Sequence, residues 1–425
     1  MGALDELAST VGLPDINSLQ ELEWRGRPRP APGGRTLPVK KHNAEKLTVT
    51  GLFAGIGGLE QGFRQAGHVS RMLCELDPLA RGVLKRHFPD AEITNDIANL
   101  KSLPRSDVVT AGFPCQDLSQ VGRRKGISGP NSGLIGYLFE LLRGATEHPR
   151  WLVIENVPFM LNLDRGHAIR TITSALEDLD YSWAYRTIDA RSFGLPQRRR
   201  RVILLASKTC DPRPVLLGVD AGYPKSAKRG SHGCGFYWTE GNTGIGWAVD
   251  SVPPLKGGSA LHIPSPPAIW FPRRRFIGVP AIEDAERLQG FGAGWTRTEA
   301  DPRTERQRWR MVGNAVSVPM AKWIAERLCA PVERFDEKVA EPLPSDRGWP
   351  NAAWGHGGKS ARSDVSEWPT VRSLSHLIPF LEHPVAPLSK KATAGFHSRL
   401  VESSLRYEEA FERDLRIHLK NVAKY

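Results

Sequence analysis

Short apolar segments alternate with helix-forming segments between residues 47 and 206, and this alternation constrains the fold more than any other feature. Residues 47–52 and 69–74 have the character of buried strands, and helices are expected to begin at Gly57 and Asp77. Strands that alternate with helices form a parallel sheet covered on both faces. We therefore predict an α/β fold, in which ligands bind at the C-terminal ends of the strands. Further short apolar runs lie at 108–111, 151–154 and 202–206.

The pattern changes after residue 206. Residues 209–282 are rich in Gly, Pro, Ser and Trp, so we expect a small, irregular, β-rich domain there. Helical spacing returns at 282–288 and at 316–328. Residues 399–422 are expected to form one amphipathic helix that packs on the body of the protein or binds a partner. Its apolar side would consist of Val401, Leu405, Phe411, Leu415, Leu419 and Val422.

The chain of 425 residues carries 58 Lys and Arg against 46 Asp and Glu, a net charge of +12. Residues 1–46 and 331–425 contribute +1 each, which leaves +10 for residues 47–330. A basic excess of this kind displaces counterions from a phosphate backbone, although the same charge also serves solubility.

The five cysteines include no Cys-x-x-Cys pair, which argues against a disulfide framework and against a zinc site. Because no apolar run is long enough to cross a bilayer, we expect a cytoplasmic protein, and we expect no metal.

A glycine-rich turn follows the first expected strand. Gly55, Gly57 and Gly58 open a helix, where backbone N–H groups can approach an anionic group. Glu75 ends the next strand, where an acid can bind ribose hydroxyls. The turn alone suits a dinucleotide equally well, but its spacing is not Gly-x-Gly-x-x-Gly. The combination favours S-adenosylmethionine.

Residues 112–119 read GFPCQDLS, and Cys115 stands behind a proline at the end of an apolar run. This placement is typical of a prepared nucleophile and points to chemistry on a pyrimidine ring. Free cysteine has a pKa of about 8.5, so the thiol needs activation, which the basic residues 123–125 would favour. The alternative is a buried structural cysteine.

These blocks together resemble the C5-cytosine DNA methyltransferase family over most of residues 47–330. The blocks are FAGIGG (53–58), GFPCQDLS (112–119), ENV (155–157), QRRRR (197–201), ERLQGF (286–291) and GNAV (313–316). The resemblance implies a Rossmann-like S-adenosylmethionine-dependent methyltransferase domain with a mostly parallel sheet, plus a small irregular β-rich target-recognition domain. Within it, the implied units are a catalytic domain that binds S-adenosylmethionine (47–208), a target-recognition domain (209–292) and a return segment that completes the catalytic domain (293–330). From composition and apolar spacing we add a flexible acidic-then-basic N-terminal extension (1–46) and a C-terminal extension that ends in an amphipathic helix (331–425).

The resemblance also implies a set of residues that bind S-adenosylmethionine. Glu75 would bind the ribose, and Asp96 and Ile97 would contact the adenine edge. One departure is Gly51, since family members often carry an acid at this position, and its absence puts the affinity for the cofactor in doubt. The full set is Phe53, Gly55, Gly58, Glu75, Asp96, Ile97, Pro114, Asn314 and Val316.

The chemistry that the family performs needs a covalent adduct, because cytosine C5 is too weakly nucleophilic to take a methyl group unaided. The Cys115 thiolate would attack C6 of the ring, and Glu155 would donate a proton or hydrogen bond at N3. Arg199 and Arg201 would hold the target base, its phosphate or the activated ring. They alternate onto one face if the segment is extended.

Duplex DNA buries the target atom, so the cytosine must rotate out of the helix. Residues 116–136 resemble the mobile loop that closes over the DNA, and residues 209–282 would read the sequence in the major groove. The candidate DNA contacts are Gln120, Arg123 and Arg124 in the loop, and Arg273, Arg274 and Arg275 in the recognition segment.

The resemblance therefore implies a site-specific DNA (cytosine-5-)-methyltransferase. Its architecture resembles the modification half of a restriction–modification system. The expected partner is double-stranded DNA, and the enzyme is expected to be a monomer. A cognate restriction endonuclease would act separately. Two alternatives remain open at this stage: an RNA (tRNA) C5-cytosine methyltransferase of the same architecture, and an inactive DNA-binding relative.

Overall fold

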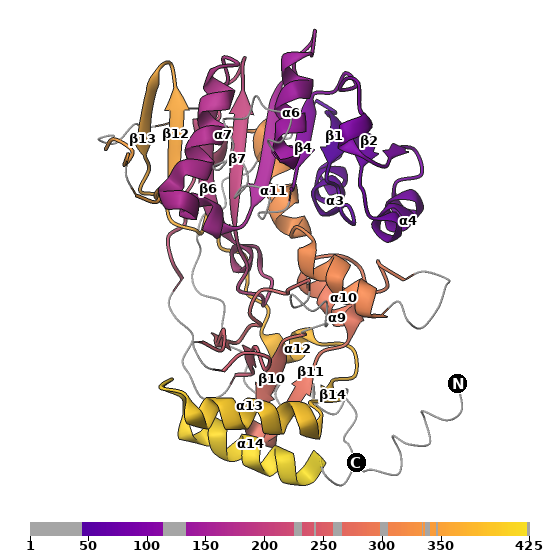
Figure 1. Cartoon of the computed structure of the whole chain (residues 1–425), viewed down its shortest axis with the longest axis vertical. Coiled ribbons are helices and arrows are strands. Elements are labelled where there is room, and N and C mark those ends of the chain that lie inside the picture. Colours follow the sequence, from indigo (N-terminus) through magenta and orange to yellow (C-terminus); the bar gives the residue numbers. More distant parts are fainter. Residues whose placement is uncertain are drawn as a thin grey trace.

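The computed structural model forms a large α/β body and a smaller second sheet, which lie one above the other in Figure 1. Five predicted site residues lie outside the described residues: Pro114, Cys115, Gln120, Arg123 and Arg124. The structure describes residues 45–113, 133–224, 232–241, 244–257, 266–297, 305–333, 335, 341–345 and 347–422.

The larger sheet confirms the predicted α/β fold. Its strand order is β13-β12-β6-β7-β5-β4-β1-β2-β3. The pairs that join β5, β4, β1, β2 and β3 are parallel, whereas those from β5 through β7, β6 and β12 to β13 are antiparallel. The strands are β1 (Thr48–Leu52), β2 (Val69–Cys74), β3 (Glu92–Thr94), β4 (Val108–Ala111), β5 (Trp151–Asn156), β6 (Ser182–Asp189), β7 (Arg200–Ser207), β12 (Ala352–His356) and β13 (Lys359–Arg362).

Helices cover both faces of this sheet, and the strand residues alternate between two apolar cores. In β5, Leu152 and Ile154 pack in the core with the first pair of helices, whereas Val153 packs in the core with the second pair. Both faces are therefore buried, as expected for a sheet of this class. The first pair is α6 (Leu134–Arg143) and α7 (His167–Glu177), and the second is α3 (Gly58–Gln65) and α11 (Val318–Cys329). Helix α4 (Pro78–His87) packs in a third core.

Residues that bridge the two sheets belong mainly to the third core, which includes Leu84, Val252, Leu288 and Val312. These residues come from α4, the second sheet region and the return of the chain. Of the remaining short elements, α9 (Ile282–Leu288), α10 (Glu305–Asn314) and α12 (Leu377–Phe380) contribute to this third core. The others pack in the first two cores: η1 (Ile97–Asn99), η3 (Pro158–Leu161), η4 (Leu163–Gly166), η5 (Ala190–Phe193) and α8 (Arg213–Leu216). The helical spacing expected at 282–288 is confirmed as α9.

The smaller sheet is antiparallel throughout, in the order β14-β11-β10-β8-β9. The two C-terminal helices lie against it (Figure 1), with Phe396, Phe411 and Leu415 buried against Phe236 and Trp270. Its elements are β8 (Cys234–Phe236), β9 (Ala248–Val249), β10 (Ala268–Phe271), η6 (Pro272–Arg274), β11 (Phe276–Val279), β14 (Ala386–Pro387), α13 (Lys390–Glu402) and α14 (Glu409–Val422).

The single helix expected over 399–422 is wrong, because α13 ends at Glu402 and α14 begins at Glu409. Ser403 takes an extended conformation, and its hydroxyl donates to the Leu400 carbonyl at 2.7 Å, which ends the first helix. The expected packing of this tail on the body is confirmed for Phe411 and Leu415, but Val401 is half exposed. Serine competes for backbone hydrogen bonds in this way at helix ends.

The C-terminal extension completes both sheets. Its β12 pairs antiparallel with β6 at the edge of the large sheet, and its β14 pairs with β11 at the edge of the small one. Among the helices of the described ranges, none has the length and apolar character needed to span a membrane.

The substitution Phe411→Ala is expected to destabilise the protein by about 3–5 kcal/mol, because it empties a fully buried aromatic site in the smaller core. The matched control is Val401→Ala on α13, which is 50% exposed and is expected to change stability by less than about 0.5 kcal/mol. Urea unfolding of the two variants and the wild type measures both values. Equal stabilities for the two variants would show that α14 does not contribute to this core.

Candidate active site

One cavity of about 670 Å³ lies at the C-terminal ends of β1, β2 and β3. Six of the nine residues predicted to bind the cofactor line it, although they come from distant parts of the chain. A pocket of this size suits a small-molecule ligand. The six are Phe53, Gly55, Glu75, Asp96, Ile97 and Asn314, and they are joined by residues that the sequence did not single out, among them Leu76, Leu79, Asn95, Leu134, Arg310 and Met311.

The glycine-rich turn forms one end of the cavity. Gly55 and Gly57 have φ angles of 57° and 82°, in the left-handed region that glycine adopts without strain. A side chain on Gly57 would also collide with the Phe88 ring, at 2.5 Å from the ideal Cβ position. Gly57 caps α3, so the turn directs the start of that helix along the cavity.

Glu75 braces this turn across the ends of β1 and β2. Its Oε2 accepts from the Gly55 N–H at 2.7 Å, and its Oε1 accepts from the Asp77 N–H at 2.8 Å. A carboxylate oxygen has further lone pairs, so the group can also accept hydrogen bonds from a ligand. Asp77 in turn caps α4 through the Leu79 N–H at 2.9 Å and pairs with Arg310 of α10.

The segment at the end of α10, where the chain returns to the large sheet, closes the other side of the cavity. Val316 lies on the N-terminus of α3, and a side chain on Gly58 would meet the Val316 carbonyl at 2.5 Å. Gly58 is therefore required for this close approach. Gly58 and Val316 do not line the cavity but fix the neighbouring wall, which includes Asn314.

A buried carboxyl group occupies the space beside Gly51, the position where family members often carry an acid. Glu60 of α3 places its Oε1 where a Cβ on Gly51 would project, and it accepts from the Thr110 hydroxyl at 2.9 Å. Burial raises the pKa of Glu60 to about 7, so the group is partly protonated at neutral pH. The chain therefore supplies a carboxyl group to this region from the helix instead of from the strand.

Glu155 is the second-last residue of β5 and lies beside Gly112 and Phe113. Its Oε2 lies 3.6 Å from the ideal Cβ position of Gly112, which itself lines the cavity. The next side chain, Asn156, donates to the Phe113 carbonyl at 3.1 Å and holds the turn two residues before the cysteine. The Glu155 carboxylate therefore lies between the cavity and this turn.

Arg201 pairs with Glu155, with 2.8 Å between Arg201 Nε and Glu155 Oε1. Both side chains are about one-tenth exposed, so solvent screens the pair weakly. Arg200, the residue before, is directed away and pairs with Glu367. The expected alternation along this segment is thus present, because Arg199 and Arg201 lie on the side of Glu155.

Arg199 is fully buried and bonds to backbone carbonyls. Its guanidinium donates to Leu255 at 3.0 Å, to Gly313 at 3.2 Å and to Ala315 at 2.6 Å. Burial lowers the pKa of this guanidinium. The carbonyls of Gly313 and Ala315 flank Asn314, so Arg199 holds the cavity wall against the segment between β9 and β10 of the smaller sheet.

Two buried glutamines strengthen the same junction. Gln197 accepts from the Leu255 N–H at 3.0 Å and donates to Gln289 at 3.2 Å, while Gln289 donates to the Val312 carbonyl at 2.8 Å. The blocks 197–201, 286–291 and 313–316, far apart in sequence, are therefore in direct contact. Within the described part of the chain, the hydrogen bonds of these two glutamines join protein segments to one another.

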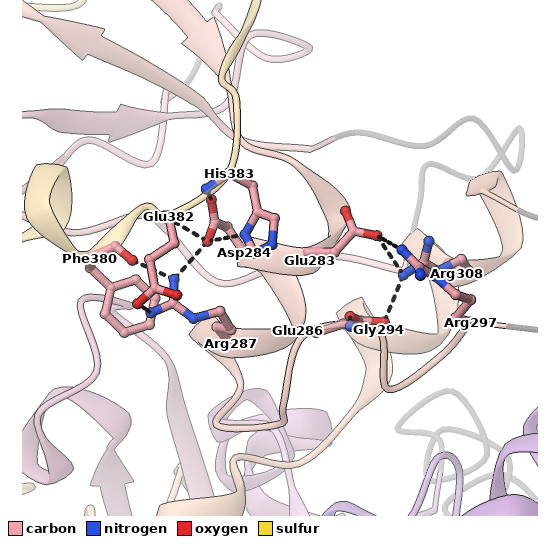
Figure 2. A network of polar contacts seen from close by, with 10 residues as sticks. All are labelled: Glu283, Asp284, Glu286, Arg287, Gly294, Arg297, Arg308, Phe380, Glu382 and His383. Carbon is pink, nitrogen blue, oxygen red and sulfur yellow. Dashed lines mark hydrogen bonds and ion pairs between the residues drawn. The ribbon is translucent and has the colours of Figure 1, made fainter. Parts of the chain in front are cut away.

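Figure 2 shows that the acidic residues of α9 fix the chain on two sides. Asp284 accepts from the N–H groups of Glu382 and His383 at 3.1 and 3.0 Å, which secures the C-terminal extension. Glu286 accepts from the Thr296 N–H at 2.8 Å and from Arg308 at 3.0 Å, which secures the approach to α10. The sequence showed this block but not what it contacts.

The predicted DNA contacts Arg273, Arg274 and Arg275 lie in the turn between β10 and β11. All three are exposed. They belong to the smaller sheet and do not line the cavity, and their contact with DNA stays a prediction.

Comparison with known proteins finds a family model, curated relatives and solved structures that this chain resembles. The family model described as C-5 cytosine-specific DNA methylase matches residues 47–217. The Type II methyltransferase M2.BsuMI of Bacillus subtilis (strain 168) is 47% identical over 381 residues, which cover 87% of this chain and 97% of that protein. The Type II methyltransferase M1.ScrFI of Lactococcus lactis subsp. cremoris is 30% identical over 335 residues, 70% of this chain and 82% of that protein. A solved structure of the S. pombe Dnmt2 methyltransferase aligns with a TM-score of 0.48 at 16% identity, over 67% of this chain and 97% of that one.

The buried carboxyl of Glu60 is expected to make stability depend on pH. Its pKa is about 7 in the folded chain against 4.5 as the ordinary value, so the folded state binds the proton more tightly. The resulting stability is present at acidic pH and is lost as the pH rises from about 4.5 through about 7. Over this pH range the wild type should lose stability on the order of 3 kcal/mol, and Glu60→Gln should not show this loss.

The measurement is urea unfolding of wild type and Glu60→Gln at about pH 5 and about pH 8. The exposed Glu140→Gln on α6 is the matched control, and its pH profile should follow that of the wild type. Parallel profiles for all three proteins would contradict the assignment of a raised pKa to Glu60.

The substitution Gly313→Ala is expected to weaken binding of S-adenosylmethionine. The added methyl group would overlap the backbone of Lys256 and Gly257, which cannot move without straining the bonds of Arg199. Overpacking of this kind costs about 1–3 kcal/mol. Calorimetric titration with the cofactor and thermal unfolding measure the two effects.

The matched control for this variant is Gly82→Ala in α4, the helix whose start lines the same cavity. Nothing lies within 4 Å of the added methyl group, and alanine is the better helix former by about 1 kcal/mol. Unchanged cofactor affinity in Gly313→Ala would mean that the junction does not determine the shape of the cavity.

Proposed function

This chain belongs to the C-5 cytosine-specific DNA methylase family, and on that basis we propose that it transfers a methyl group from S-adenosylmethionine to C5 of cytosine in a short duplex DNA sequence. The observation that carries the proposal is the convergence of six expected cofactor residues on one cavity beside Glu155. Membership of the family supports the reaction class, and the cavity supports the ligand.

The residues present fit S-adenosylmethionine. Glu75 offers carboxylate oxygens at the rim for ribose hydroxyls, Asp96 offers a second acid, and Ile97 and Leu76 offer apolar surface for an adenine ring. The surplus of carboxylates over cations also suits a ligand that carries a sulfonium charge. When bound, this ligand supplies the methyl group. The chain's residues bind it and direct it towards the turn at Gly112.

The proposed reaction begins when the Cys115 thiolate attacks C6 of the flipped cytosine and forms a carbon–sulfur bond. Electron density moves to the N3 side of the ring, where the Glu155 carboxyl donates a proton or hydrogen bond. The ring is then an enamine, and its C5 takes the methyl group. Loss of the C5 proton to a base and cleavage of the bond to Cys115 restore aromaticity and the free thiol.

Arg201 would keep Glu155 in position and neutralise charge that develops at the ring. This follows from the 2.8 Å contact between the two side chains at the end of β5. Arg199 would act as a positioning residue, because both terminal nitrogens of its guanidinium donate to carbonyls of the junction. We assign it to holding Asn314 and the recognition segment in place, not to contact with the base.

The smaller sheet would bind DNA as the target-recognition domain, encoded mainly by residues 209–292. The exposed arginines 273–275 suit contacts with phosphates. In the segment that closes over the duplex, Gln120, Arg123 and Arg124 are the proposed contacts. The cytosine would leave the duplex to reach Cys115 and Glu155.

The biological setting follows from the relatives. Both curated relatives described above are Type II methyltransferases by name, and one matches this chain over 87% of its length. We therefore infer that this enzyme, as a monomer, methylates one recognition site of nucleoid DNA and protects it from a separate cognate endonuclease.

The first test is methyl transfer from tritiated S-adenosylmethionine to mixed-sequence duplex DNA and, in parallel, to tRNA, followed by bisulfite sequencing of the DNA. Protection of cytosines in one short context is expected. Labelling of tRNA alone would overturn the DNA substrate, and no labelling of either would favour an inactive DNA-binding relative.

A second test addresses the two catalytic residues. A duplex whose target cytosine carries fluorine at C5 cannot lose a proton there, so the wild-type enzyme should remain covalently attached after denaturation. Cys115→Ala should abolish this adduct, and Glu155→Gln should slow methyl transfer to normal DNA by about 10²–10⁴-fold. The matched thiol control is Cys210→Ala, remote from the cavity lining, which should retain both activities. An adduct in Cys115→Ala would refute the mechanism.

A further inference from the structure

Three side chains that bind metals meet at one end of the smaller sheet, away from the cofactor cavity. His232 lies two residues before β8, and Asp250 directly follows β9. His376 stands at the N-cap of α12 in the C-terminal extension. Their potential ligand atoms lie within 4.8 Å of one another, and they are the only group of three or more His, Cys, Asp or Glu with this spacing in the described ranges.

Backbone hydrogen bonds hold these three segments together. The Asp250 N–H donates to the Gly233 carbonyl at 2.9 Å, next to His232. The Leu377 N–H donates to Asp250 Oδ1 at 2.9 Å, next to His376. Asp250 Oδ1 is thereby fixed, while Oδ2 remains directed at the two imidazole rings. This resembles the way in which surrounding hydrogen bonds orient carboxylates that bind metals.

The two imidazoles approach one carboxylate oxygen. His376 Nδ1 lies 2.5 Å and His232 Nδ1 lies 3.6 Å from Asp250 Oδ2. The rings are nearly parallel, with 13° between their planes and 5.1 Å between their centroids. Only His376 Nδ1 is within hydrogen-bond distance of Asp250 Oδ2. His232 Nδ1 therefore lies at the site without a hydrogen bond to that oxygen.

The spacing suits a small divalent ion. Zinc binds imidazole nitrogen at about 2.0–2.1 Å in a tetrahedral arrangement, which sets ligand atoms about 3.3 Å apart. His376 is 58% exposed, so its ring can rotate to lengthen its contact with Asp250. Water would fill the remaining position of the ion.

We propose that His232, Asp250 and His376 form a binding site for a first-row divalent transition metal ion such as Zn²⁺. Two imidazoles and one carboxylate favour this class over Mg²⁺ and Ca²⁺, which prefer oxygen ligands. The site is structural, because it links the β8–β9 end of the smaller sheet to the C-terminal extension. The proposal does not depend on the function proposed above.

The consequence of such a link is a firmer attachment of α12. Leu377 and Leu381 of this region are buried in the core that also holds Val252 and Leu255. The chain then continues to Glu382 and His383, which Asp284 of α9 binds (Figure 2). An ion that binds only the folded protein raises its stability by mass action, so the metal should raise the unfolding temperature.

The test uses the full-length protein, stripped of metal with a chelator and then dialysed. Isothermal titration with Zn²⁺, Co²⁺ and Mg²⁺ measures affinity, and thermal unfolding measures the stability shift. We expect Zn²⁺ and Co²⁺, but not Mg²⁺, to bind and to raise the unfolding temperature. His232→Ala, Asp250→Asn and His376→Ala should each weaken Zn²⁺ binding by at least about tenfold.

His376→Ala is the most informative variant, since the side chain is exposed and makes no capping hydrogen bond to α12. The matched control is His383→Ala. His383 also contacts a buried aspartate, Asp284, at 3.1 Å, but it belongs to no such group of two histidines and a carboxylate. The control should bind Zn²⁺ like the wild type. Equal Zn²⁺ affinity in wild type and His376→Ala, or a wild type that binds no Zn²⁺ or Co²⁺, would overturn the proposal.

Discussion

The buried guanidinium of Arg199 is the interaction on which the rest of the structure depends. The chain leaves the large sheet for the smaller one and then returns to cover the cofactor cavity. Arg199 bonds to Leu255, between β9 and β10 of the smaller sheet, and to Gly313 and Ala315 on the return. A buried cation without partners would be costly, so the three carbonyls must stay in place around it. This requirement fixes the recognition segment against the cofactor wall.

The contacts of Arg199 with Leu255, Gly313 and Ala315 determine the shape of the neighbouring cavity wall. Asn314 lies between the two carbonyls that Arg199 binds on the return segment, and Val316 lies against Gly58 at the start of α3. The same helix carries Glu60, whose carboxyl fills the space next to Gly51. A carboxyl group therefore reaches the region next to Gly51 from the helix and not from the strand.

The C-terminal extension joins the two parts of the protein from the outside. It adds β12 and β13 to the edge of the large sheet and β14 to the edge of the small one, and its last two helices cover an apolar face. Unpaired sheet edges and exposed apolar faces favour aggregation. The extension therefore moves one edge of each sheet to a short strand, β13 or β14, and covers one apolar face, and Asp284 binds it near its middle.

The sequence by itself determined the features that short segments encode: the strands at 69–74 and 108–111 and the turn at Gly55 and Gly57. It also singled out six residues that line one cavity. The apolar periodicity did not show the local break at Ser403 between α13 and α14. The sequence also could not show the burial of Arg199 or the meeting of His232 with His376. Apolar periodicity and turn glycines act over a few residues and are legible in one chain. Contacts between segments more than 50 residues apart depend on how whole elements pack, so only the tertiary structure decided them.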